Sequence, residues 1–384
     1  MSKWPMVPLR EVLERRKDEV SVEEYEIYKR LTIRLNGNGI TVRDQLPGSE
    51  IGTKKQFRVH AGQLVLSKID ARNGAFGILS TYGDNAIITG NFWAFDHNPN
   101  RLDVSFFDYF TKTGAFVDLC IKASEGTTNR LYLQEDLFLQ MEIPLPPLPE
   151  QQKIVKWIDA VATRIEEANT EVDSSTKKLD NLLMSTFLDI TEGAPQSPLE
   201  EIAPLARRPV EIDPSAEYPG ISARSFGRGT FHNPPLQGSE ITWQKPYEVR
   251  AGDILVSNIK AWEGAMAVVG PEDDGRFGSH RYLTFEPKAG VATPRFVCFY
   301  LLSPEGLFHV GEASPGSADR NRTTGSRAMQ NIPVPVPQYE QQLWFDQLYE
   351  KVEEAKRLIT ENQAERSALL PSVLNQVFNG DEST

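Results

Sequence analysis

Residues 143–152 read IPLPPLPEQQ, and residues 332–342 read IPVPVPQYEQQ. In both places a proline-rich run leads directly into a long polar segment. Proline removes a backbone donor and is excluded from helix interiors and central strands, so each run predicts a stiff, extended exit from a globular part. Glu150 and Glu340 then fall in the first turn of the helix that follows, where the helix dipole favours a negative charge. The two stretches therefore predict a fixed junction between a domain and a helix, made twice.

The chain is a tandem repeat. Residues 59–79 (VHAGQLVLSKIDARNGAFGIL) align without a gap to residues 249–269 (VRAGDILVSNIKAWEGAMAVV) at an offset of 190, with eight identities in 21 positions. The same offset pairs RLNGNG (34–39) with RSFGRG (224–229), NFWAF (91–95) with RYLTF (281–285), and PLREV (8–12) with PLEEI (198–202). A repeat constrains the architecture before any single element is assigned. We infer two copies of one unit, each a globular part followed by a helical arm.

Each globular part has the pattern of an α+β domain. GQLVLSKI (62–69) and GDILVSNI (252–259) are short β-rich runs entered by a turn glycine, whereas residues 104–120 and 294–310 carry aromatic residues at helical spacing. We expect mixed, mostly antiparallel sheet in both parts. The expected boundaries are 1–145 and 193–335 for the globular parts, and 146–192 and 336–384 for the helical arms.

Apolar or small residues in the arms follow a heptad rhythm. Steps of four and three residues run from Ile154 to Thr186 and from Phe345 to Val373, with polar interruptions at Asn362 and Arg366. Such a seam requires a helical partner, and the simplest arrangement is an antiparallel coiled coil of the two arms, roughly 60 Å long, that separates the two domains. The expected seam residues are Ile154, Ile158, Val161, Ile165, Leu179, Leu182, Leu348, Val352, Ile359 and Leu369.

The negative charge is concentrated in the arms. The formal net charge is −12, and residues 150–192 and 338–384 together account for −9 of it, which leaves −3 for the rest of the chain. The distribution of charge decides which surfaces attract an anion, so an acidic total does not exclude a DNA-binding surface on the globular parts. Acidic helices suit protein partners.

Several other classes of protein lack support in the sequence. No stretch approaches the roughly 20 apolar residues that span a bilayer, and the N-terminus has no apolar run of signal-peptide length, so we expect a cytoplasmic protein. Cys120 and Cys298 lie in apolar contexts that predict buried structural thiols. The five histidines (60, 97, 232, 280 and 309) show no metal-ligand spacing, and no P-loop or GxSxG motif is present.

An adenine methyltransferase is a further alternative. NPPL (233–236) resembles the Asn-Pro-Pro-aromatic motif that holds a flipped base, and SFGRG (225–229) is glycine-rich. However, Leu236 stands where an aromatic residue is needed, the two motifs lie too close together for a cofactor domain, and the first copy has no Asn-Pro-Pro. We therefore expect no enzyme activity from this chain.

In their order and duplication, these features resemble the specificity subunit of type I restriction-modification enzymes. The resemblance covers the whole chain, including AGDILVS (251–257), EGTTNRLYLQEDL (125–137) and LLPSVLNQVFNG (369–380). It implies that each globular part is a target recognition domain that reads one half of a bipartite site in double-stranded DNA, and that the coiled coil sets the spacer length.

The resemblance also implies the partners. The coiled coil would dock two modification subunits, which methylate adenine, and the restriction-translocase subunits would join through them. The chain itself would be non-catalytic and hold no cofactor or metal, since S-adenosylmethionine, ATP and Mg²⁺ would belong to the partner subunits.

Candidate DNA contacts are hydrogen-bond donors in the loop before each proline strand and at aligned positions of the repeat. Donors of different polar type on a shared frame suit two readers of different sequences, although neutral surface drift and simple turn formation give the same pattern. The candidates are Arg34, Lys54, Lys55, Lys68, Arg72, Asn73, Thr127, Thr128, Asn129, Arg130, Arg224, Asn258, Lys260, Arg320, Asn321, Arg322 and Arg327.

The alternative function is a two-domain structural adaptor that binds protein or RNA without reading duplex DNA. Charge alone does not separate the two. A DNA reader predicts binding that depends on sequence and on the gap between half-sites, whereas an adaptor predicts indifference to that gap.

Overall fold

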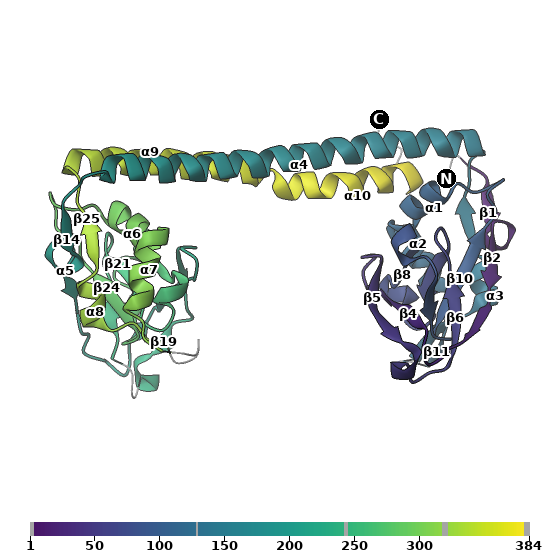
Figure 1. Cartoon of the computed structure of the whole chain (residues 1–384), viewed down its shortest axis with the longest axis horizontal. Helices are drawn as coiled ribbons and strands as arrows, with labels where there is room; N and C mark the ends of the chain where they lie inside the picture. Colours follow the sequence, from purple (N-terminus) through teal and green to yellow (C-terminus); the bar gives the residue numbers. More distant parts are fainter. Residues whose placement is uncertain (1–3, 128–129, 242–244, 317–321, 380–384) are drawn as a thin grey trace. The chain divides into compact units, whose positions relative to one another are not determined.

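The computed structural model describes residues 4–127, 130–241, 245–316 and 322–379 (Figure 1). The chain divides into a first unit, residues 1–172 with 361–384, and a second unit, residues 173–360. The long helix α4 (Leu148–Thr191) contributes residues to both units. No described helix is both long enough and apolar enough to cross a membrane.

The first unit contains a four-stranded sheet of order β2-β10-β7-β8 and a five-stranded sheet of order β3-β6-β9-β4-β5. Within these sheets the contact between β4 and β9 is parallel and the other pairings are antiparallel. The strands are β1 (Met6–Pro8), β2 (Leu13–Arg16), β3 (Asp18–Ser21), β4 (Ile27–Ile33), β5 (Ile40–Pro47), β6 (Lys55–Val59), β7 (Leu64–Ser67), β8 (Phe76–Ile78), β9 (Ala86–Ile88), β10 (Phe92–His97), β11 (Ser124–Thr127), β12 (Arg130–Leu133) and β13 (Glu142–Pro144). The helices are α1 (Val104–Thr111), α2 (Gly114–Lys122) and α3 (Glu135–Gln140).

The second unit repeats the four-stranded sheet in the same order, β15-β24-β21-β22. In place of the five-stranded sheet it has separate two-stranded pairings, β16 with β19, β17 with β18 and β20 with β23. Its strands are β14 (Gln196–Pro198), β15 (Leu205–Ala206), β16 (Glu217–Tyr218), β17 (Ile221–Ala223), β18 (Thr230–His232), β19 (Leu236–Gln237), β20 (Tyr247–Glu248), β21 (Ile254–Ser257), β22 (Met266–Val268), β23 (Phe277–Gly278), β24 (Tyr282–Phe285) and β25 (Pro333–Pro335). The helices are α5 (Leu199–Ile202), α6 (Pro294–Leu302), α7 (Pro304–Glu312) and α8 (Ser326–Gln330). Both units are therefore α+β with mostly antiparallel sheet, as predicted.

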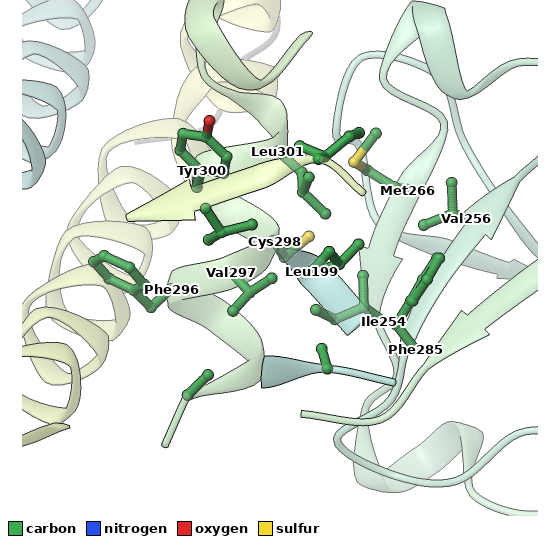
Figure 2. Close-up of a cluster of buried hydrophobic side chains, with 14 of the residues drawn as sticks. Leu199, Ile254, Val256, Met266, Phe285, Phe296, Val297, Cys298, Tyr300 and Leu301 are labelled. Carbon is green, nitrogen blue, oxygen red and sulfur yellow. The ribbon is translucent and has the colours of Figure 1, made fainter. Parts of the chain in front are cut away.

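Each core lies between the four-stranded sheet and the helices that cover it. Figure 2 shows this in the second unit, where Ile254 and Phe285 of the sheet pack with Phe296 and Tyr300 of α6. Fully burying a side chain of this size contributes roughly 1.5–3 kcal/mol. Cys120 and Cys298 lie in these two cores and are free thiols, which confirms the prediction of buried structural cysteines.

Each proline strand is an edge pairing. In the first unit β13 pairs antiparallel with β1, and in the second unit β25 pairs antiparallel with β14. Proline suits such short two-stranded pairings because the missing N–H interrupts no central ladder. The chain segment that begins each copy thereby holds the segment that leaves it.

The helical arms pair antiparallel within each unit. In the second unit, α9 (Tyr339–Glu361) lies along α4, where Lys356 forms an ion pair with Asp180 at 2.5 Å and Phe345 packs on Phe187. In the first unit, Arg366 Nε of α10 (Gln363–Asn379) donates to Asn169 Oδ1 at 3.3 Å. Positions therefore fall along one helix as they rise along α4, which confirms the antiparallel pairing.

Two of the predicted seam positions are wrong. Leu182 and Leu369 are 45% and 47% exposed, whereas Leu183 is buried and Leu370 packs against the first core. A strict heptad pattern advances 3.5 residues per turn and drifts about 20° per heptad relative to a straight α-helix. Over a helix of 44 residues the buried stripe moves by one position. Ile158 and Val352, nearer the start of each pattern, are buried as expected, and the other predicted positions, Ile154, Val161, Ile165, Leu179, Leu348 and Ile359, are partly buried.

The second arm is two helices rather than one. Helix α9 ends at Glu361 and α10 begins at Gln363, so the arm breaks at Asn362, one of the polar interruptions of the heptad pattern. Asparagine competes with helical hydrogen bonds through its own side chain, and no apolar side chain at this position holds the segment in the seam. Helix α10 continues through Pro371 and ends by placing Leu374 and Phe378 in the first core.

A buried glutamine fastens each helix to its domain. Gln151, the first glutamine of PEQQ (149–152), is fully buried. Its Oε1 accepts from the backbone N–H of Asp103, and its Nε2 donates to the carbonyls of Arg101 and Pro146, all at 2.8 Å. One side chain therefore joins α4, the proline strand and the start of α1.

Gln342 repeats this arrangement in the second unit. Its Oε1 accepts from the N–H of Thr293, and its Nε2 donates to the carbonyls of Val291 and Pro337, each at 3.0 Å. Both glutamines satisfy three backbone groups that would otherwise be buried without partners. The repeated EQQ is thus part of the junction, in addition to the acidic first turn that the sequence predicted.

Candidate nucleic-acid interface

In each unit, backbone hydrogen bonds join the shared RxxGxG turn to the turn that follows β7 or β21. In the first unit the N–H groups of Asn36 and Gly37 donate to the carbonyls of Asn73 and Gly74 at 2.8 and 3.0 Å. Gly74 has φ +79°, and a Cβ there would lie 2.6 Å from the backbone N of Gly37, so only glycine allows this approach. The pairing brings the predicted residues Arg34, Arg72 and Asn73 onto neighbouring turns.

The second unit makes the same pairing. The N–H groups of Phe226 and Gly227 donate to the carbonyls of Glu263 and Gly264 at 2.7 and 2.9 Å. Ser225 Oγ also donates to Glu263 Oε2 at 2.9 Å. The backbone of the two turns is therefore duplicated, whereas the exposed side chains on it differ between the copies.

A second set of backbone bonds joins three further positions, which we call the reading frame. In the first unit it comprises residues 68, 91 and 133: Lys68 N–H donates to the carbonyl of Asn91 at 3.0 Å, and Leu133 N–H donates to the carbonyl of Lys68 at 2.8 Å. These bonds connect the end of β7, the residue before β10, and β12. The strand β12, which follows the predicted residues 127–129 and begins at Arg130, thus ends beside Lys68.

The second unit has the same reading frame at residues 258, 281 and 324. Asn258 N–H donates to the carbonyl of Arg281 at 2.8 Å, and Thr324 N–H donates to the carbonyl of Asn258 at 2.6 Å. The first two positions correspond at an offset of 190 and the third at 191. The loop before the third position is therefore one residue longer in the second copy, which accounts for the changed spacing after it.

Several of the predicted DNA contacts are engaged within the protein. Lys54 Nζ donates to the carbonyl of Gly48 at 2.7 Å, and Lys55 pairs with Glu19 at 2.9 Å. Lys260 pairs with Glu263 at 2.6 Å, and Arg224 donates to the carbonyl of Thr230 at 2.6 Å. Asn73 donates to Asp70 Oδ1 at 3.2 Å, and Arg322 donates to the carbonyls of Gly311 and Ser314. Lys54 and Lys55 lie outside both duplicated frames, and their role in DNA binding stays a prediction.

Other predicted donors are uncommitted. Arg34, Lys68, Arg72 and Arg327 make no side-chain hydrogen bond or ion pair with any residue that the structure describes. Donors of this kind are available for phosphate oxygens or base edges. The backbones of Thr127 and Arg130 are opposite each other in the register of β11 and β12. Thr128, Asn129, Arg320 and Asn321 lie outside the described residues.

An aromatic cation cluster lies beside the reading frame of the second unit. Arg322 is stacked over the ring of Trp262 at 4.8 Å, and Lys260 Nζ lies 5.2 Å from the same ring centroid. Trp262 Nε1 and Asn258 Oδ1 are buried and find no hydrogen-bond partner in the described part of the chain. Buried polar groups without a protein partner are rare in folded proteins, so these two atoms are candidates for a contact with water or a ligand.

The reasoning from sequence missed Asn91 and Arg281. Both occupy the middle position of the reading frame, both are exposed, and neither side chain has a partner among the described residues. A signal was available, since NFWAF and RYLTF align at the common offset and differ in polar type at their first position. Within the described residues no group of three or more His, Cys, Asp and Glu side chains suits a metal ion.

Comparisons with known proteins agree with this architecture. Residues 1–172 match the sequence profile of the type I restriction modification DNA specificity domain. The fold is similar to that of the HsdS subunit from Thermoanaerobacter tengcongensis, with 18% identity, a TM-score of 0.57, and coverage of 98% of this chain and 97% of that one. A chain from a structure concerned with complex assembly and conformational transition of the type I R-M system gives a TM-score of 0.68 at 18% identity, covering 98% of each. Comparison with curated proteins gives no match.

The chain shares its repeated α+β domain and its antiparallel pair of helices with these two structures. At 18% identity this is a likeness of fold, and it extends over nearly the whole chain. The family match covers residues 1–172, less than half of the chain, and the likeness to the solved structures extends over the rest. These findings confirm the resemblance predicted from the sequence.

Proposed function

We propose that this chain is the DNA-recognition subunit of a type I restriction-modification complex and that each globular domain reads one half of a bipartite target. The observation that carries this proposal is the duplication of the reading frame. The backbone bonds at residues 68, 91 and 133 recur at residues 258, 281 and 324, while the side chains at these positions differ. A shared frame with different hydrogen-bonding groups suits two readers of two different sequences.

The helices are proposed to set the gap between the two half-sites. A fixed spacer between two readers makes affinity depend on the distance between half-sites, as in dimeric repressors. The continuous helix α4, which contributes to both units, and the buried junctions at Gln151 and Gln342 support this role.

The same helices are proposed to dock two modification subunits. Several large apolar side chains of the helices are exposed, and where such side chains form a contiguous patch they mark a protein contact. In the first unit they are Trp157 and Leu369, and in the second unit Leu182, Leu188, Leu343, Trp344 and Leu358. The presence of one junction per copy suggests one modification subunit per copy.

The chain is proposed to be non-catalytic. Methylation of adenine, hydrolysis of ATP and cleavage of DNA would be performed by the modification and restriction subunits, and S-adenosylmethionine, ATP and Mg²⁺ would be bound there. The specificity family that matches residues 1–172 supports this division of labour.

Methylome sequencing tests the proposal. Cells that express this chain with its modification subunits should carry methyl-adenine in one bipartite motif, and the motif should vanish when this chain is deleted. Purified complexes should then bind duplexes with the native gap and lose most of that binding when the gap is changed by two base pairs. Binding that is indifferent to the gap would favour the structural adaptor instead.

A further inference from the structure

The residues at the middle positions of the two reading frames support an inference about which side chains read the DNA. This inference rests on the proposed function. Asn91 and Arg281 are equivalent in the repeat, and each accepts a backbone hydrogen bond through its carbonyl, from Lys68 at 3.0 Å and Asn258 at 2.8 Å. The backbone at all four residues is therefore fixed by the fold. A fixed backbone sets the point from which each side chain extends, which a contact with a defined base edge requires.

The side chains on this fixed backbone are unlike in the two copies. The first unit presents a lysine and an asparagine, and the second unit presents an asparagine and an arginine in the opposite order. Arginine and lysine suit guanine O6 and N7, whereas asparagine suits adenine N6 and N7. The two frames therefore offer different base preferences from equivalent places.

Three of these four side chains are uncommitted, and the fourth, Asn258, has a buried Oδ1 atom. Lys68, Asn91 and Arg281 have no side-chain hydrogen bond or ion pair among the described residues, and the Oδ1 atom of Asn258 also lacks a partner there. This contrasts with many other arginines of the chain, such as Arg208, which is paired with Asp253 and Glu286. This acidic chain pairs many of its arginines with carboxylates, whereas Lys68, Asn91 and Arg281 have no such pairing among the described residues.

The surroundings in the first unit have the shape and chemistry of a contact surface. Lys68 and Asn91 line an open depression of about 750 Å³ together with Trp93, Tyr132, Gln134 and two acidic residues, Glu135 and Asp136. Tyr132 and the adjacent Ile69 are 36% and 37% exposed, which provides apolar contact beside the donors. Donors next to an apolar patch match a base-pair edge that carries hydrogen-bonding atoms and a thymine methyl group.

We infer that Asn91 and Arg281 are specificity-determining residues that read base edges, one in each half-site, each alongside the residue to which its carbonyl is bound, Lys68 or Asn258. Phosphate contacts are assigned elsewhere, to donors such as Arg34 and Arg72 on the adjoining turns. The two roles differ in a measurable way. Loss of a base contact relaxes the sequence preference at one position, whereas loss of a phosphate contact weakens binding to all sequences and lowers the salt dependence.

The test is methylome sequencing of cells that express the full chain with its modification subunits, carrying Asn91→Ala or Arg281→Ala. Asn91→Ala should relax one base position in one half of the motif and leave the other half unchanged, and Arg281→Ala should do the reverse. The discrimination against a wrong base at that position should fall by about 5- to 160-fold, as expected for one bidentate contact. Lys288→Ala, an exposed basic residue outside the frames, is the matched control and should leave the motif intact.

Equilibrium binding of the purified complexes separates the possible outcomes. A motif that remains bipartite and unchanged in both variants would overturn the assignment of these residues while leaving the proposed function standing. Uniformly weaker binding with a smaller salt slope would also overturn it, because that result identifies phosphate contacts. Absence of any bipartite motif in the unaltered chain would reject the proposed function itself. Both substituted residues are exposed, and equal melting temperatures would show that the fold is intact.

Discussion

Thr293 Oγ1 donates to Asp346 Oδ1 at 3.1 Å, at the point where α9 leaves the second domain. Asp346 is also near Arg295 and Glu350, which pair with each other at 3.6 Å. Burial raises the pKa of Asp346 to about 6, although the hydrogen bond from Thr293 and the charge of Arg295 oppose this change. The carboxylate is therefore less favourable in the folded protein than in the unfolded chain.

This shift predicts a pH-dependent junction. The folded pKa lies above the unfolded value of 3.8, so the penalty is absent below about pH 4 and develops as the pH rises to 6. Asp346→Asn, which keeps an acceptor for Thr293, should stabilise the second unit by about 1–2 kcal/mol at pH 7 after allowance for solvent screening. It should have no effect at pH 4. Thermal melts across this range measure the difference, and a constant gap between the two proteins would contradict the prediction.

The buried glutamines should be essential to the junctions. Gln342→Ala leaves the N–H of Thr293 and the carbonyls of Val291 and Pro337 without their partner, and we expect a loss of about 3 kcal/mol or more. Gln152, the exposed neighbour of the equivalent Gln151, is the control, and Gln152→Ala should change stability by less than about 0.5 kcal/mol. Urea unfolding measures both. Equal effects would show that the hydrogen bonds of Gln342 contribute little.

Two adjacent leucines on α4 should differ in how much a charged substitution destabilises the chain. Leu183 is buried in the second core, so Leu183→Asp should cost several kcal/mol through an unpaired buried carboxylate. Leu182→Asp should leave the free chain nearly unchanged, because Leu182 is exposed. The proposed docking of modification subunits predicts weaker assembly of the complex for Leu182→Asp, measured by titration calorimetry. Unfolding by Leu182→Asp would mean that the heptad seam was the correct assignment after all.

Phe226 should be replaceable at a gain in stability. Its φ is 64°, a left-handed conformation that is unfavourable for a bulky side chain, and 70% of its surface is exposed. The equivalent Asn36 adopts φ 59°, so Phe226→Asn should stabilise the second unit by about 1 kcal/mol. Phe308→Asn, at an exposed position in α7, should bring no such gain. Thermal unfolding of both variants gives the comparison, and equal changes in melting temperature would exclude relief of backbone strain.

The repeat made the fold predictable. Aligned segments such as NFWAF and RYLTF identify equivalent strands in the two copies. The proline strands identify where each domain ends. The register of the helices was less accessible, because Leu182 and Leu183 are both leucines and the choice between them depends on how far a straight helix has turned. The break at Asn362 depends on the absence of an apolar contact that the sequence shows only as an interruption.

The candidate site was predicted in part. Residues near the aligned strand, such as Lys68 and Asn258, were found because the alignment is gapless there. Asn91 and Arg281 were missed because their significance comes from a backbone hydrogen bond between segments distant in sequence, which a linear pattern does not reveal. For the same reason nothing in the sequence separates Lys54 and Lys55, which are engaged within the first unit, from Arg34, whose side chain has no partner among the described residues.

The extra residue in the second copy lies between Ala313 and Thr324, and both ends of that segment are tied by the bonds that hold Ala123 and Leu133 in the first copy. Insertions there are confined between two anchored points and leave the following strand and helix in place. Evolution can therefore lengthen, shorten or exchange this segment in one half of the protein without disturbing the other. If the proposed function holds, changes in this segment can alter the target sequence without changing the junctions between domain and helix.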